Sequence, residues 1–204
     1  MAPLICVVDD DESVRESLQE LLESADYSVE VFGSAMRFLA SDTLARCACL
    51  VVDIRMPEMD GLELQEELGR RKFRFPVIII TGHGDVPLAV RAMKAGARDF
   101  LEKPFNEDTL LDSIRRALEA PLAGPAAAPD PAIAERMAQL TERERQVLHL
   151  LVIGHPNKVI AQKLDISFRT VEIHRARVFA KMRAGSVAEL VRMVLAQESA
   201  PRGA

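Results

Sequence analysis

The hydrophobic and polar positions of residues 1–119 alternate between short apolar runs and longer amphipathic stretches. The apolar runs, rich in β-branched residues, predict strands at 4–8, 28–32, 49–52, 77–81 and 99–101. Between them, apolar positions recur at helical spacing and predict helices at 12–24, 34–40, 61–70, 85–95 and 106–118. Five strands alternating with five helices predict an α/β doubly wound fold with a five-stranded parallel sheet.

Residues 136–204 show only the helical period. We expect four helices there, at 142–153, 158–164, 168–182 and 187–197. Thr141 with Glu144, and Ser186 with Glu189, have the spacing of capping boxes, and Asn157 and Ser167 are of the residue types preferred as N-caps. The short segment "DIS" between the second and third helices is typical of a helix-turn-helix, so this part is predicted to be an all-α four-helix domain.

A proline- and alanine-rich segment, "APLAGPAAAPDPA" at residues 120–132, lies between these two parts. It holds four prolines and no large apolar residue beyond Leu122, so it favours a semi-stiff tether over an ordinary surface loop. The charge balance differs on the two sides of this segment. Residues 1–119 carry 14 basic and 23 acidic residues, whereas residues 136–204 carry 12 basic and 6 acidic residues. We therefore predict two domains, 1–119 and 136–204, joined by a linker at 120–135, with different partners.

Composition places the chain among globular proteins, with 49% hydrophobic and 28% charged residues and a net charge of −5. No apolar run approaches the ~20 residues that span a bilayer, and the N-terminus lacks the basic start of a signal peptide, so we expect a cytoplasmic protein without a membrane partner. The three cysteines, Cys6, Cys47 and Cys49, lack metal-finger spacing. A thiol sensor is one interpretation of the pair Cys47 and Cys49, but small core side chains in a reducing compartment are favoured.

Polar residues follow the predicted strands where each of them ends. Asp9 to Glu12 follow the first strand, Asp53 the third, Thr81 closes the fourth and Lys103 follows the fifth. Because the carboxyl ends of parallel strands share one edge, these groups should meet there. Clustered carboxylates need a cation, and Mg²⁺ prefers one or two of them with waters and a phosphate oxygen. The set therefore predicts phosphoryl chemistry, with Asp53 as nucleophile and with Mg²⁺, Lys103 and the Thr81 hydroxyl binding the phosphoryl oxygens.

Each of these residues has a plainer interpretation when taken alone. The acidic run Asp9–Glu12 suits any helix N-terminus, Asp53 could be an N-cap or turn former, and Lys103 followed by proline is common. Their joint occurrence, in order and each at a strand end, favours the site. Gly82 beside Thr81 would leave room for the phosphoryl group.

The segments "VVDDDE", "VVDIRMPEMDG", "TGHGD" and "DFLEKPF" together resemble the receiver domain of two-component response regulators, over residues 3–119. That family has the flavodoxin-like form of the predicted fold. The resemblance implies Mg²⁺ as cofactor and the following roles: Asp53 as phospho-acceptor, Asp9, Asp10, Asp53 and the Arg55 backbone carbonyl as metal ligands, Thr81 and Lys103 as catalytic groups, and Thr81 and Phe100 as the switch pair. A plain core phenylalanine is the other interpretation of Phe100.

The helix at 168–182 carries basic residues outside an apolar stripe formed by Val171, Val178 and Met182. A helix of this size fits the DNA major groove, with lysines nearby for phosphates. The predicted DNA-binding residues are Lys158, Lys163, Arg169, Thr170, Glu172, Ile173, Arg175, Ala176, Arg177 and Lys181. A solvated basic helix face is the alternative, and the role of His174 stays open.

This second part resembles the LuxR-type (GerE-like) DNA-binding domain in "LTERERQVL", "NKVIAQKLDIS", "RTVEIHRARV" and "KM". The whole chain thus resembles transcriptional regulators of the FixJ/NarL family, closest to the FixJ branch. The resemblance implies phosphorylation of Asp53 by a sensor histidine kinase, homodimerisation through residues 85–118, binding to double-stranded promoter DNA, contact with RNA polymerase, and activation of transcription. Phe168, where the family often has proline, and Arg177, where it often has a polar amide, leave the operator sequence open.

The sequence disfavours two rival functions. A phosphohydrolase could also use an aspartyl nucleophile, but the sequence offers no obvious second catalytic acid or cap domain, so we expect no enzyme. A regulator that works without phosphorylation is disfavoured, because Asp9, Asp10, Asp53, Thr81 and Lys103 are all present.

Overall fold

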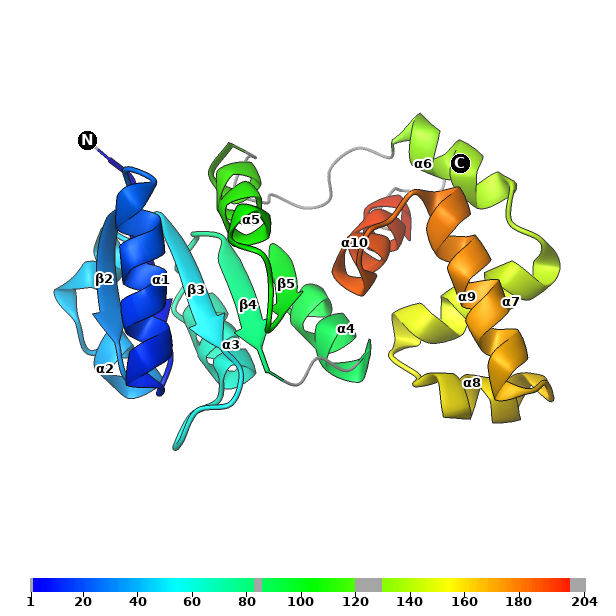
Figure 1. The fold of residues 1–204 in the computed structure, drawn as a ribbon, viewed down its shortest axis with the longest axis horizontal. Coiled ribbons are helices and arrows are strands. Elements are labelled where there is room, and N and C mark those ends of the chain that lie inside the picture. The colour runs from blue at the N-terminus through cyan, green and yellow to red at the C-terminus, as the bar shows by residue number, and fades with distance from the viewer. Residues whose placement is uncertain (1, 83–85, 120–129, 199–204) are drawn as a thin grey trace. The chain divides into compact units, whose positions relative to one another are not determined.

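A computed structural model describes residues 2–82, 86–119 and 130–198 of the chain (Figure 1). The chain forms two compact units, residues 1–84 with 95–122, and residues 85–94 with 123–204. Most of the predicted linker, residues 120–129, lies outside the described residues.

The first unit contains a five-stranded parallel sheet in the order β2-β1-β3-β4-β5. The strands are β1 (Leu4–Val8), β2 (Ser28–Phe32), β3 (Cys49–Asp53), β4 (Val77–Thr81) and β5 (Asp99–Glu102). All five strands were predicted to within one residue, and the parallel α/β fold is confirmed. β1 has β2 on one side and β3 on the other, so the chain reverses its direction of winding between β1 and β3. In such sheets the loops beside this reversal form the binding crevice.

The helices of the predicted α/β pattern are α1 (Glu12–Ser24), α2 (Ala35–Leu39), α3 (Gly61–Arg70), α4 (Val86–Lys94) and α5 (Glu107–Glu119), and a 3₁₀ turn at Asp42–Ala45 was not predicted. α1 and α5 cover one face of the sheet, and α2 and α3 lie on the other (Figure 1). On the first face, Ile5, Val51 and Ile78 from the sheet pack with Leu22 and Ile114 from the helices. Since Val77–Thr81 is buried at every position, its unbroken apolar run matches a strand covered on both sides.

Backbone packing fixes where α3 begins. Asp60 accepts from the Glu63 N–H at 2.8 Å, and Glu63 reaches back to the Asp60 N–H, which makes a capping box. A Cβ on Gly61 would lie 2.3 Å from the Asp53 carbonyl oxygen. Only glycine therefore lets α3 start this close to the end of β3.

Besides α4, the second unit contains the predicted helices α7 (Glu142–Ile153), α8 (Asn157–Leu164), α9 (Phe168–Met182) and α10 (Val187–Glu198), and one that was not predicted, α6 (Pro131–Ala138). α6 was missed, because the segment was interpreted as part of a proline-rich tether. Asp130 caps α6 through the Ala132 N–H, and Pro131 takes the first helical position, where its missing N–H costs nothing. α9 packs against α6, α7 and α8.

The caps agree with prediction in part. Thr141 with Glu144 forms the predicted capping box, and Ser167 caps α9. Asn157 was wrongly predicted as a cap: Pro156 holds that position and Asn157 is the first helical residue of α8. Glu189 donates its N–H to Ser186 Oγ, but its carboxylate accepts from the Gly185 N–H, so this second box is incomplete.

The three cysteines are free and buried within the first unit. A contact with Cys6 and burial both raise the pKa of the Cys47 thiol, and burial raises that of Cys49 to about 12. Thiols held in the protonated form behave as small apolar side chains, as the favoured interpretation expected. Among the helices of the described residues, none combines the length and apolar character that a membrane span requires.

Candidate functional site

Three charged side chains from separate strand ends meet at one edge of the sheet. Lys103, which follows β5, donates to Asp9 Oδ2 at 2.7 Å and to Asp53 Oδ1 at 2.8 Å. These contacts join residues 94 and 50 positions apart, so only the fold brings them together. Asp9 and Asp53 are 1% and 6% exposed, and both carboxylates are therefore largely withdrawn from water. The predicted cluster of carboxylates and lysine is present at the expected edge.

The charges at this cluster do not balance. Burial lowers the pKa of Lys103, but its hydrogen bonds to Asp53 and Asp9 outweigh that and raise it, so the ammonium group stays charged. Burial raises the pKa of Asp9 more than the bond from Lys103 lowers it. One ammonium group thus faces two buried carboxylates, so a further positive charge would be favourable at this cluster.

One backbone N–H and one side chain fix the orientation of the Asp53 carboxylate. The Arg55 N–H donates to Asp53 Oδ2 at 2.5 Å, while Lys103 holds the other oxygen. Thr81 is fully buried at the end of β4, and Phe100 in β5 is 8% exposed. Both predicted switch side chains therefore lie inside the fold. Residues 83–85, shortly after Thr81, lie outside the described residues.

Of the predicted acidic ligands, Asp10 is exposed beside the buried Asp9. Their neighbour Asp11 plays a different part, because its carboxylate caps α1 by accepting from Ser13, which lowers the pKa of Asp11. The plainer interpretation, a helix N-terminus, is therefore right for Asp11. Of the two residues before it, Asp9 belongs to the cluster with Lys103, and the predicted role of Asp10 as a metal ligand stays a prediction.

Sequence reasoning missed Arg15. Its guanidinium donates to the backbone carbonyls of Asp9 at 2.8 Å and Asp10 at 3.0 Å, and so holds the β1–α1 loop in place. A cation on the first turn of the helix after an acidic run was the available signal. Gly33 lies beside this guanidinium, and a Cβ there would approach it to 3.4 Å.

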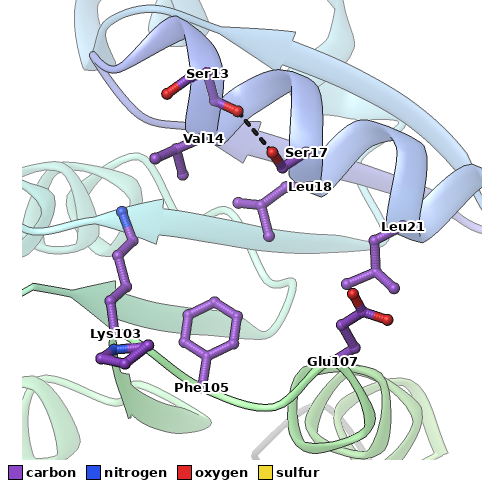
Figure 2. A pocket seen from close by; sticks show the side chains of 9 residues that line it. Ser13, Val14, Ser17, Leu18, Leu21, Lys103, Phe105 and Glu107 are labelled. Atoms are coloured by element: carbon purple, nitrogen blue, oxygen red, sulfur yellow. Dashed lines mark hydrogen bonds between the residues drawn. The ribbon is translucent and has the colours of Figure 1, made fainter.

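A pocket of about 300 Å³ adjoins the cluster through Lys103 (Figure 2). α1 supplies one wall and the segment after β5 supplies the other. Figure 2 shows Val14, Leu18, Leu21 and Phe105 facing the space between them. The pocket therefore offers an apolar surface directly beside the charged cluster.

The ten predicted DNA-binding residues in α8 and α9 divide into two sets. Seven are exposed, and they are Lys158, Lys163, Arg169, Glu172, Ile173, Ala176 and Arg177. Five of them, from Arg169 to Arg177, share one face of α9, opposite the buried stripe that includes Val171 and Val178. The stripe is fully buried, as predicted, and a positively charged face is left to solvent.

The other three predicted residues are partly buried and make contacts inside the domain. Thr170 Oγ1 lies 2.7 Å from Ser167 Oγ at the start of α9. Lys181 forms an ion pair of 2.7 Å with Glu144, which lowers the pKa of that carboxylate.

The third residue, Arg175, donates to Asn157 Oδ1 at 3.1 Å, across from α9 to α8. On the same helix, the Nδ1 atom of His174 is buried without a hydrogen-bond partner among the described residues. The structure thus places His174 partly inside the domain, whereas the sequence left its role open.

Comparison with known families finds two matches, one in each part of the chain. Residues 5–115 match the family described as the response regulator receiver domain. Residues 138–194 match the family described as bacterial regulatory proteins, luxR family.

Curated relatives match along almost the whole chain. The transcriptional regulatory protein FixJ of Rhizobium meliloti is 52% identical over 191 residues, which cover 93% of this chain and 94% of the relative. The response regulator protein TodT of Pseudomonas putida is 45% identical over 193 residues, which cover 94% of this chain and 85% of the relative.

Solved structures agree with the sequence matches. Response regulator StyR aligns over 95% of this chain and 98% of its own, with a TM-score of 0.55 and 42% identity. The isolated N-terminal part of FixJ aligns over 61% of this chain and 99% of its own, with a TM-score of 0.55 and 45% identity. With the receiver cluster and the basic helix-turn-helix on one chain, this protein belongs to the FixJ-type response regulators, transcriptional regulators that join a receiver domain to a LuxR-type DNA-binding domain.

Proposed function

We propose that Asp53 accepts a phosphoryl group from a phosphohistidine of a sensor histidine kinase. The observation that carries the proposal is Lys103 bridging Asp9 and Asp53 at the carboxyl edge of the sheet. In the transfer, an Asp53 oxygen forms the new P–O bond while the P–N bond to the histidine breaks, and the imidazole keeps the electron pair. The Arg55 N–H and Lys103 hold the carboxylate in one orientation for this attack.

Receiver domains generally bind Mg²⁺ at their acidic pocket, and the residues of this chain fit that ion. Lys103 leaves one negative charge of the buried pair uncompensated, and Asp10 adds an exposed carboxylate beside it. No group of three or more acidic, histidine or cysteine side chains that could hold a metal occurs in the described ranges, but Mg²⁺ needs only one or two carboxylates with waters. Asp9, Asp10, Asp53 and the Arg55 carbonyl would hold the ion, which would neutralise charge on the phosphoryl oxygens.

The response to phosphorylation is proposed to run through residues 85–118. Thr81 would bind the phosphoryl group and Phe100 would turn with it, so that the surface of this segment favours a homodimer. Domains at 1–119 and 136–204, joined by a linker at 120–135 that passes into α6, would then place two DNA-binding units together. The chain would act in the cytoplasm, on double-stranded promoter DNA with RNA polymerase, as an activator.

The kinase is proposed to dock over the apolar pocket shown in Figure 2. A phosphohistidine must come within bonding distance of Asp53, and this pocket shares Lys103 with the cluster. Its apolar lining would seat a partner helix beside the nucleophile. The Ser13 and Ser17 side chains stand at its edge, where a larger residue would obstruct docking.

Light scattering on the full chain tests the phosphorylation switch. Wild type and Asp53→Asn are compared with and without beryllofluoride and Mg²⁺. A change from monomer to dimer in wild type alone supports the proposal and places the switch at Asp53. A change in both proteins, or equal stimulation of DNA binding in both by a phosphodonor, would overturn it.

A further inference from the structure

Arg175 does not lie on the face of α9 that the exposed basic residues share. Each residue advances an α-helix by about 100°, so Arg175 stands about 160° around the axis from Ile173. Ile173 is 45% exposed and lies on the solvent face, whereas Val171 and Val178, on the stripe nearest Arg175, are fully buried. The position of Arg175 therefore directs its side chain toward the interior of the domain.

Two contacts hold the guanidinium of Arg175 inside the domain. One guanidinium nitrogen donates to Asn157 Oδ1 at 3.1 Å. The central carbon of the guanidinium, Cζ, lies 5.5 Å from the centre of the Phe179 ring. Asn157 is the first residue of α8, and Phe179 stands one turn further along α9. The guanidinium thus connects the start of α8 to the middle of α9.

These contacts use features that only arginine combines. A planar guanidinium can donate from its edge while its face lies against an aromatic ring, and a lysine ammonium group cannot do both in this way. Burial lowers the pKa of Arg175, which agrees with a group that has exchanged water for these partners. Asn157, which leaves the capping position to Pro156, has its side-chain oxygen available as the acceptor.

We infer that Arg175 is a positioning residue that fixes the angle between α8 and α9 through Asn157 and Phe179, and does not contact DNA phosphate. The inference rests on DNA binding by this domain. The angle matters because α8 would meet the DNA backbone while α9 presents base-reading side chains. A change in that angle would impair sequence discrimination and leave the number of phosphate contacts unchanged.

The test measures binding of the full chain, with a phosphodonor present, to two duplexes by fluorescence anisotropy. One duplex is the sequence that the wild-type chain enriches from a random pool, and the other is a scrambled version of it. Variants are Arg175→Lys, Arg175→Met and Asn157→Ala, with Lys163→Met as the matched control for an exposed cation. Each titration is repeated across a range of salt concentrations, and thermal unfolding is followed for every variant.

We expect all three variants at positions 175 and 157 to lose about tenfold in the ratio of enriched to scrambled affinity, which is roughly what one charge-assisted hydrogen bond contributes. Their salt slopes should equal that of wild type. Lys163→Met should instead weaken both duplexes alike and reduce the slope by about 0.9 for each phosphate that the protein no longer neutralises. The double variant Arg175→Met with Asn157→Ala should lose no more than either single variant, because both remove the same contact.

Three results would overturn the inference. They are a reduced salt slope in Arg175→Met, a wild-type affinity ratio in Arg175→Lys, or an unchanged ratio in Asn157→Ala, which leaves the guanidinium in place. Should Arg175→Met fail to fold, Asn157→Ala still decides the matter. Failure of the wild-type chain to enrich any duplex would count against the proposed function and not against Arg175 in particular.

Discussion

Removal of the Lys103 ammonium group should make the stability of the first unit depend on Mg²⁺. Lys103→Met keeps most of the side-chain length but leaves Asp9 and Asp53, which are 1% and 6% exposed, without their shared counter-charge. At 2.7 and 2.8 Å, each pair has an attraction of about 6 kcal/mol at an effective dielectric constant of about 20. Desolvation offsets much of this, and removal of one partner from a buried pair typically costs about 3–5 kcal/mol.

A loss of that size is a large share of the stability of a domain, which is about 5–15 kcal/mol. The site needs positive charge and not lysine in particular, so Mg²⁺ should restore part of the loss. In chelator, we expect Lys103→Met to unfold with a free energy lower by about 3 kcal/mol or more. In Mg²⁺, the difference from wild type should shrink to about half.

The chain provides its own probe for this measurement. Tyr27 is the one tyrosine, the sequence has no tryptophan, and the side chain packs against the core of the first unit. Tyrosine fluorescence during urea unfolding therefore follows this unit while the second unit remains silent. Arg74→Met, which removes an exposed cation from the same unit, serves as the control and should change little in either condition.

Asp53→Asn is the second comparison. It removes one of the two carboxylates, so Lys103 is left with a single matched partner, and stability in chelator should hold or rise. Two results would contradict this prediction: a loss of less than about 1 kcal/mol by Lys103→Met in chelator, or the same loss with and without Mg²⁺. Either result would mean that the carboxylates find another source of compensation.

Three further predictions follow from single contacts. Gly61→Ala should lower the Tyr27 unfolding midpoint and slow labelling of the protein by acetyl phosphate, because the new Cβ would meet the Asp53 carbonyl oxygen at 2.3 Å; unchanged labelling would contradict this. Ser17→Arg, at the exposed edge of the pocket beside Lys103, should slow transfer from a sensor kinase at least tenfold while labelling by acetyl phosphate stays normal. The lowered pKa of Glu144 means that its ionised form stabilises the second unit above about pH 4.5, and that this contribution disappears as pH falls through the lowered value. Glu144→Gln should therefore cost about 1–2 kcal/mol at neutral pH, seen by circular dichroism, and little in acid.

The elements of the first unit could be predicted from the sequence because two independent signals coincide there. Apolar runs such as Val77–Thr81 carry the strand pattern, and polar or glycine-containing turns separate them from amphipathic helices. The site followed from the same pattern, since a parallel sheet gathers its strand ends at one edge. Arg15 was not predicted because it donates to backbone carbonyls, and every residue has a backbone carbonyl, so the sequence does not show which ones are its partners.

The second unit shows where the sequence was insufficient. α6 begins inside a stretch whose prolines and alanines were interpreted as a tether. Its stability depends on packing against α9, including a bond from the Arg136 guanidinium to the Met182 carbonyl at 3.2 Å, and such tertiary support is invisible to a local pattern. Asn157 was assigned by residue type to a cap, whereas its partner proved to lie 18 residues away.

Charge is the property whose effect a sequence most easily misstates, because a count ignores which charges meet one another. Residues 136–204 contain 12 basic and 6 acidic residues, which suggests a uniformly attractive surface for DNA. In the fold, Lys181 is paired with Glu144 and Arg175 is turned inward to Asn157, so neither offers its charge freely to a phosphate. The steepness with which salt weakens DNA binding should therefore follow the exposed cations of α8 and α9, and fall below the value that a count of all their basic residues implies. We expect these two partly buried cations to act differently: they tie α9 to α7 and α8, and that packing would determine whether the exposed cations reach the DNA in register.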